Sequence, residues 1–128
     1  MTAPTWLNEA VRAFGRQMAL SAFELNDRGA AGVRFENGVS LRLEYVGGAL
    51  VMYAGVAIEP QADVLRRLLT GAHPEAAAGL PVRAAYIERT GEGVYAIRID
   101  ERRVDVSALE ATFRVLWKLA TALGRASK

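Results

Sequence analysis

Side chains that could do catalytic or metal-binding chemistry are few in this sequence. There is one histidine, His73, and there is no cysteine. A two-histidine metal site, a thiolate nucleophile and a cysteine-type zinc site are therefore excluded. A Ser-His-Asp triad would have to use His73, and no neighbour in the sequence is placed to orient its imidazole. We interpret His73 as a surface residue of a loop.

One short motif has the letters of a dinucleotide-binding fingerprint. Residues 91–96, GEGVYA, fit the pattern G-x-G-x-x-A. That chemistry requires a helix to begin at the glycines, so that the helix N-terminus faces the pyrophosphate. A run that alternates like a strand follows the glycines here, so we interpret the motif as a β-hairpin turn.

Six carboxylates lie on or beside expected strands, where two facing side chains could do acid–base work. They are Glu36, Glu44, Glu88, Asp100, Glu101 and Asp105. Their dispersion fits a solvated sheet face more simply, and no segment resembles a phosphate-binding loop. The sequence therefore predicts no enzyme, no cofactor and no metal site.

Length and charge set the broad class. A chain of 128 residues favours one domain, residues 1–128. No apolar run approaches the ~20 residues of a membrane span, and the start, MTAPTWLNEAVR, lacks the pattern of a signal peptide. We therefore expect a cytoplasmic protein without a membrane partner. The net charge is only +2 and the arginines are dispersed, which argues against nucleic acid as a partner.

The stretch that must organise the fold is residues 33–53, VRFENGVSLRLEYVGGALVMY. Its period-two alternation predicts three antiparallel strands at 31–36, 39–46 and 49–54. Asn37-Gly38 is a strong hairpin signal, and Gly47-Gly48 makes a second turn. In the middle strand one face is apolar and the other is polar. The apolar face carries Val39, Leu41, Leu43 and Tyr45, and the polar face carries Ser40, Arg42 and Glu44.

The remaining segments supply helices and a second hairpin. Apolar stripes predict helices at 4–18, 60–70 and 107–123, and Ser107 with Glu110 reads as a capping box for the third. Residues 82–104 form the second hairpin, residues 55–58 an exit loop and residues 71–81 a surface loop. We expect a fraying end after the third helix. The fold class is α+β, an antiparallel sheet flanked by three helices in the order α-β-β-β-α-β-β-α.

The apolar content exceeds what one small core needs. The chain is 52% hydrophobic, and large apolar side chains stand on both sides of the expected helices. They include Trp6 and Phe14 on the first helix, the patch at residues 64–69 on the second, and Val115 and Trp117 on the third. Apolar surface left over in a small protein marks a partner site. We therefore expect a homodimer or a partner groove.

With these elements in hand, the chain resembles a class I type III secretion chaperone of the Tir-chaperone-like family. The resemblance is carried by LNEAVRAFGRQMAL (7–20), VRFENGVSLRLEY (33–45), ALVMYAGVA (49–57) and SALEATFRVLWKLATAL (107–123). It implies a cytoplasmic homodimer without enzymatic activity, involved in virulence. Such a dimer binds the N-terminal chaperone-binding segment of a secreted effector protein and keeps it secretion-competent.

The resemblance also implies two surfaces. The dimer interface of such chaperones uses the second helix and the strand after it, here Val64, Leu65, Leu68, Leu69, Ala84 and Tyr86. Effector binding uses the first helix and the sheet, here Leu7, Val11, Phe14, Leu43, Val51 and Tyr53. Two alternatives remain open. One is a regulatory or adaptor dimer of the same fold, not involved in secretion, and the other is a small enzyme or ligand-binding domain with a deep polar pocket.

Overall fold

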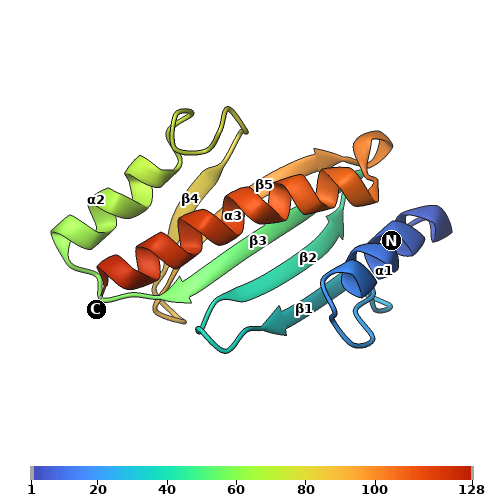
Figure 1. Ribbon diagram of the computed structural model, residues 1–128, viewed down its shortest axis with the longest axis horizontal. Helices are drawn as coiled ribbons and strands as arrows, with labels where there is room; N and C mark the ends of the chain where they lie inside the picture. Colours follow the sequence, from blue (N-terminus) through green and yellow to red (C-terminus); the bar gives the residue numbers. More distant parts are fainter. Residues whose placement is uncertain (1, 128) are drawn as a thin grey trace.

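The computed structural model describes residues 2–127, which fold as three helices and five strands (Figure 1). In chain order the elements are α1 (Thr5–Gln17), β1 (Ala30–Arg34), β2 (Ser40–Val46), β3 (Ala49–Ala57), α2 (Ala62–Gly71), β4 (Arg83–Ile87), β5 (Glu92–Asp100) and α3 (Val106–Ala126), with one 3₁₀ turn at Glu101–Arg103. This is the α+β class and the element order predicted from the sequence.

The five strands form one antiparallel sheet in the order β1-β2-β3-β5-β4. The two predicted turns join the first three strands. Gly38 has φ +90° at the first turn, and Gly47 and Gly48 have φ +54° and +77° at the second. Side chains other than glycine rarely adopt these values, which explains the residue choice at both turns.

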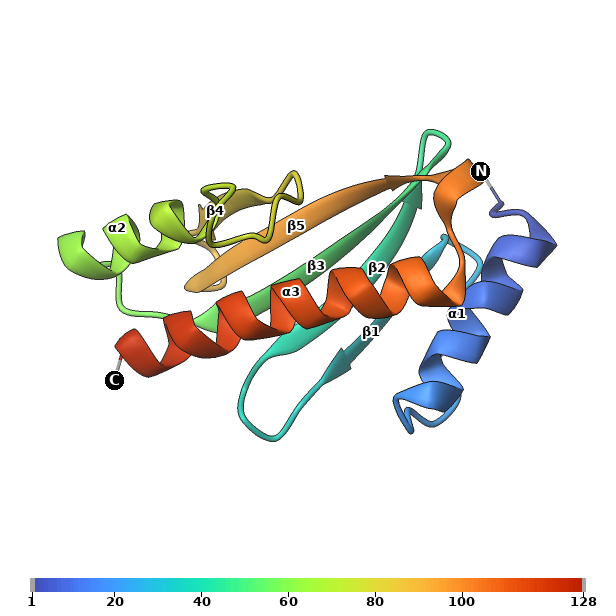
Figure 2. The ribbon, with the colours of Figure 1, turned by 45° about the horizontal axis from the view of Figure 1, so that its top comes forward.

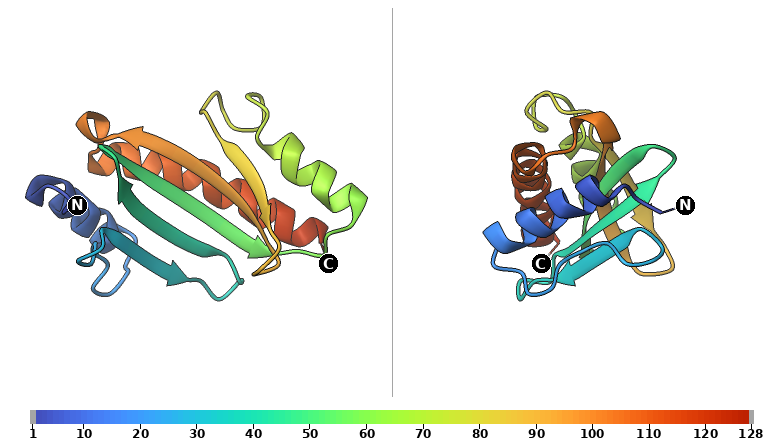
Figure 3. Two further views of the ribbon diagram at one scale, coloured as in Figure 1. Left: turned by 180° about the vertical axis from the view of Figure 1, so that it is seen from behind. Right: turned by 90° about the vertical axis from the view of Figure 1, so that its right-hand side faces the viewer.

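The helices cover one face of the sheet. Figures 2 and 3 show α3 lying along that face, with α1 beside it near β1 and α2 beside it near β4. The alternation of β2 is as predicted: Leu41 and Leu43 are fully buried, whereas Arg42 on the other face is exposed. Leu109 and Leu116 of α3 are also fully buried. Each such burial contributes about 1.5–3 kcal/mol.

Helix α1 reaches the sheet through close packing at Gly15. A Cβ added there would lie 2.7 Å from the Cβ of Phe23. Phe23 in turn packs edge-on against Phe14, with ring centroids 6.1 Å apart. The glycine therefore lets the connection after α1 fold back onto the helix.

Several boundaries differ from the sequence prediction. β3 continues through Ala57, where an exit loop was expected, because Gly55 to Ala57 stay paired with β5. α2 begins at Ala62 rather than Pro60. The connection at residues 71–81 is not wholly at the surface, since Ala77 is fully buried.

The expected capping box is wrong. The N-cap of α3 is Asp105, whose Oδ1 accepts a hydrogen bond from the backbone N–H of Ala108 at 2.7 Å. Ser107 lies inside the first turn of the helix. An aspartate two residues upstream offers the same acceptor chemistry, so the helix starts at Val106. Helix α3 also continues to Ala126, three residues beyond the predicted end at residue 123.

Candidate functional site

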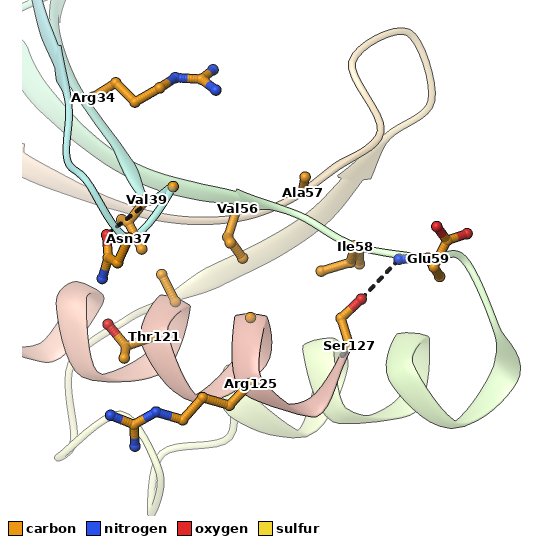
Figure 4. Close-up of a pocket in the computed structure, with 13 residues that line it drawn as sticks. Arg34, Asn37, Val39, Val56, Ala57, Ile58, Glu59, Thr121, Arg125 and Ser127 are labelled. Atoms are coloured by element: carbon orange, nitrogen blue, oxygen red, sulfur yellow. Dashed lines mark hydrogen bonds between the residues drawn. The ribbon is translucent and has the colours of Figure 1, made fainter.

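A groove lies between the C-terminal half of α3 and the ends of β1, β2 and β3 (Figure 4). Its cavity has a volume of about 530 Å³. The floor is apolar and is formed by Val39, Val56, Ile58 and Ala120, all of them buried. The rim is polar and includes Arg34, Asn37, Glu59, Arg125 and Ser127. We call this cavity the α3 groove.

Local sequence features hold the walls of the α3 groove in place. Asn37 Oδ1 accepts a hydrogen bond from the N–H of Val39 at 3.1 Å, which fixes the β1–β2 turn beside the cavity. A Cβ added at Gly124 would lie 3.1 Å from Val56, so the glycine lets α3 approach β3 closely. At the far end Ser127 Oγ accepts from the N–H of Glu59 at 2.9 Å (Figure 4).

Thr121 is a polar exception in the wall of the α3 groove. Its Oγ1 is buried and has no hydrogen-bond partner among residues 2–127. A buried hydroxyl without a partner costs about 1–3 kcal/mol. The Thr121 side chain nevertheless lines the α3 groove, so a larger residue at this position would narrow the cavity.

An aromatic cluster extends the α3 groove toward α1. Trp117, one helical turn before Thr121, packs edge-on against Phe35 with ring centroids 4.9 Å apart, and Phe113 lies 5.6 Å from Trp117. Phe35 and Trp117 are both partly exposed. Partly exposed aromatic rings next to an apolar cavity are typical of protein-binding surfaces.

The predicted effector-binding residues do not form one surface. Leu7, Val11, Phe14 and Leu43 have no exposed area, because they form the core between α1, α3 and the sheet. The other two lie on the opposite, helix-free face of the sheet. They are Val51, which pairs with Glu44, and Tyr53, which pairs with Arg42. These six side chains therefore do not form one binding site.

Tyr53 has a different environment from the one predicted for it. The guanidinium of Arg42 lies 5.7 Å from the centre of the Tyr53 ring, a cation–π contact on the open sheet face. Desolvation raises the pKa of Tyr53, Glu44 raises it further, and Arg42 opposes the change. Desolvation and Glu44 thus favour the neutral form of this tyrosine, whereas Arg42 favours the ionised form.

The predicted dimer-interface residues do come together at α2 and β4, which pack against each other. Val64 and Leu68 face inward and are buried, whereas Leu69 is 65% exposed. The rest of the set is partly exposed and packs against the core: Leu65, Ala84 and Tyr86. The set thus has a buried inner row and an exposed outer leucine. That the outer side meets a second copy stays a prediction.

Groups for acid–base or metal chemistry do not converge in the described part of the chain. Residues 2–127 hold no cluster of three His, Cys, Asp or Glu side chains able to bind a metal. His73 is exposed in the loop after α2, where its Nδ1 accepts only from the N–H of Glu75 at 3.3 Å. The G-x-G-x-x-A motif enters β5, a strand, as expected for a hairpin.

Comparison with known proteins gives a family and a fold for this chain. A profile of the type III secretory system chaperone SycN family matches residues 6–123. The chain belongs to that family. The comparison with curated proteins found no match. No helix among residues 2–127 has the length and apolarity to cross a membrane.

Solved structures with the same fold include complexes of type III secretion chaperones. A chain of the ExsC–ExsE complex superposes with a TM-score of 0.80 at 20% identity, covering 99% of this SycN-family chain and 97% of that chain. A chain of the HopA1–SchA chaperone–effector complex gives 0.69 at 21% identity, with 91% of each chain covered. A chain of the ExoU–SpcU complex from the type III secretion system of Pseudomonas aeruginosa gives 0.68 at 19%, covering 91% and 96%.

The α3 groove could not be predicted from the sequence because its parts are far apart along the chain. Arg34, Val56 and Thr121 come from three different elements. The one signal in the sequence was Trp117. It lies on a second apolar side of the third helix, outside the apolar stripe that was expected to face the core.

Proposed function

We propose that this protein is a cytoplasmic, homodimeric chaperone that binds the N-terminal segment of a type III secreted effector and keeps it secretion-competent. The observation that carries the proposal is the α3 groove, an apolar cavity with a polar rim and an aromatic extension, in a member of the SycN family. The solved complexes of ExsC with ExsE and of SchA with HopA1 support it by analogy of fold.

The groove suits an extended client rather than a folded one. A cavity of about 530 Å³ accommodates one or two apolar side chains, and the aromatic rings of Phe35 and Trp117 continue the contact. An unfolded segment loses conformational entropy on binding, so it needs several such sites along a long contact to compensate. A dimer would supply each site twice.

The role is non-enzymatic in this proposal. A chaperone needs affinity for an unfolded segment and releases it unchanged, so it needs no general base, nucleophile or metal. The absence of a His, Cys, Asp and Glu cluster in residues 2–127 is compatible with this role.

The dimer would form through α2 and β4. Leu69 is the most exposed large apolar side chain of residues 2–127, at 65%, and it lies beside Leu65 and above the buried Leu68. A two-fold interface repeats every contact, so each contact that Leu69 makes with the second copy is made again by Leu69 of the partner subunit. The expected interface residues therefore remain the six predicted from the resemblance.

The dimer is tested by light scattering coupled to gel filtration. We expect a mass of twice the chain for the native protein and a shift to monomer for Leu69→Asp. Val46→Asp is the matched control, because Val46 is 49% exposed on the β2–β3 end, far from α2 along the sheet. A native monomer, or equal effects of the two variants, would refute the interface.

Client binding is tested by affinity capture from the native cell, followed by truncation of the captured protein. We expect binding to be lost when its N-terminal segment is removed. Thr121→Arg, which fills the α3 groove, should weaken capture at least tenfold, whereas Ala111→Arg on the exposed side of α3 should not. Binding that survives truncation points instead to a regulatory or adaptor dimer of the same fold.

A further inference from the structure

Strand β4 pairs with only part of β5, so the remaining part of β5 forms an edge of the sheet. The β4–β5 pairing runs from Ile87↔Glu92 to Arg83↔Ala96 and goes no further. On its other side β5 stays paired with β3 as far as Asp100. The stretch from Ile97 to Asp100 therefore has a strand on one side only, and we call it the open end of β5.

The main-chain groups of Arg98 point to the uncovered side. Ile58 N–H donates to Gly91 O, and Glu101 N–H donates to Gly48 O, so the odd-numbered residues of β5 bond toward β3. In an antiparallel ladder the alternate residues bond to the opposite neighbour. The N–H and C=O of Arg98 are thus directed toward the side where β4 would continue.

Pro81 prevents β4 from continuing there. The register of β4 and β5 would set residue 81 opposite Arg98, since Arg83 pairs with Ala96. A proline has no N–H to give to the Arg98 carbonyl. The segment also bends, with Val82 N–H donating to Leu80 O at 2.9 Å.

A cavity of about 800 Å³ lies along the open end of β5. On the helix side its lining is apolar and includes Leu80, Ile97, Ile99 and Ala108. Thr112 also lines it and is only 6% exposed. The cavity thus offers mainly apolar contacts on this side to whatever enters.

The charge around this cavity is positive. Arg98, Arg102 and Arg103 line it together with a single acid, Asp100. Asp100 already accepts hydrogen bonds from the N–H and the Nε of Arg102, at 2.9 and 3.4 Å, and these contacts lower the pKa of its carboxyl group. Arg98 and Arg103 form no ion pair within residues 2–127.

We propose that the open end of β5 accepts one extended strand of a client polypeptide whose sequence alternates apolar, acidic and apolar residues. The inference rests on the proposed function in taking the client as the source of the strand. The added strand would pair with the main chain of Arg98, where β4 is interrupted by Pro81. Strand addition supplies affinity through the main chain and specificity through alternate side chains.

The alternation follows from the register. Arg98 projects to the helix-free face of the sheet, because its neighbours Ile97 and Ile99 are buried under α3. The client residue opposite Arg98 would project to the same face, where an acidic side chain forms a cross-strand charge pair. Its two neighbours would project to the helix side, into the apolar part of the cavity beside Thr112.

The probe is the peptide acetyl-TVEVT-amide, titrated into the ¹⁵N-labelled protein and followed by NMR. We expect saturable shifts of the Arg98 and Asp100 amide signals. The peptide acetyl-TVKVT-amide should bind at least tenfold more weakly. In Arg98→Glu the preference should reverse in favour of the lysine peptide, whereas Arg89→Glu, in the exposed β4–β5 turn, should leave it unchanged.

A second variant tests the role of the proline. Pro81→Val restores an N–H opposite Arg98, so β4 should extend by two residues, slow hydrogen exchange at Arg98 at least tenfold and abolish peptide binding. Pro74→Val, in the same connection but away from β5, is the control.

Three outcomes would overturn the inference. The first is chemical-shift changes that are confined to other parts of the protein, and the second is equal binding of the two peptides. The third is hydrogen exchange of the Arg98 amide that is slow in the free protein and becomes fast when the protein is diluted. The last would mean that a second copy of this chain covers the edge. None of these results depends on the dimer or truncation experiments, so the proposed function is tested separately.

Discussion

Gly71, at the end of α2, lies directly against the phenol of Tyr95 in β5. A Cβ added at Gly71 would contact the Tyr95 hydroxyl and would lie 2.8 Å from Cζ of the ring. The hydroxyl itself points at the main-chain carbonyl of Arg67 at 3.5 Å. This close approach sets how α2 sits on the sheet, and hence where Leu69 is presented to a second copy.

Gly71→Ala should therefore destabilise the protein by roughly 1–3 kcal/mol, the cost of overpacking a closed contact. At an ordinary helix position the same change stabilises by up to about 1 kcal/mol, so the sign is diagnostic. Urea unfolding gives the free energy. In Tyr95→Phe the clashing hydroxyl is gone, so Gly71→Ala should cost less in that background; an equal cost would refute the contact.

Stability should fall at alkaline pH because of Tyr95. The side chain is 1% exposed, and burial raises its pKa to about 12 from 10.0. A raised folded-state pKa means that the neutral phenol is favoured in the native state. Its contribution is complete below pH 10 and is lost as the pH rises from 10 to 12, by about 2–3 kcal/mol.

The measurement for this alkaline effect is the free energy of unfolding as a function of pH between 9 and 12. Tyr95→Phe removes the ionisable group and should flatten the curve over this range. Tyr53→Phe, on the open sheet face, is the control with the smaller expected effect. A native curve that matches that of Tyr95→Phe would contradict the assignment.

The cap of α3 can be distinguished by two alanine variants. Asp105→Ala removes the carboxylate that accepts from Ala108 N–H, and should cost about 0.5–2 kcal/mol. Ser107→Ala removes the hydroxyl that the sequence suggested as the cap, and should change stability by less than about 0.5 kcal/mol. Thermal or urea unfolding measures both losses of stability. A larger loss for Ser107→Ala than for Asp105→Ala would show that Ser107 caps the helix instead.

The unpartnered hydroxyl in the wall of the α3 groove predicts a gain in stability when it is removed. Thr121→Val replaces the buried Oγ1 with a methyl group of similar shape and should stabilise the protein by up to about 1 kcal/mol. Thr70→Val should give no such gain, because the Thr70 hydroxyl already donates to Arg66 O at 2.8 Å. A loss of stability in Thr121→Val would show that the hydroxyl is satisfied in solution.

The sheet and the element order could be predicted from local patterns of residues. Period-two alternation at residues 39–45 and the turn glycines Gly38 and Gly47 act locally, so they specify strands and hairpins without knowledge of distant residues. The expectation of a non-enzymatic role rested on equally local information, since one histidine and no cysteine leave few combinations of catalytic side chains.

Which apolar side chains remain available to a partner could not be predicted in this way, because it depends on how the elements pack. Phe14 and Trp117 have the same kind of apolar pattern in the sequence, yet Phe14 is completely buried and Trp117 is partly exposed. Exposure depends on which helix covers which strand, and helical periodicity does not contain that information. The effect of Pro81 on the sheet also depends on tertiary structure, because only the register between β4 and β5 places this proline opposite Arg98.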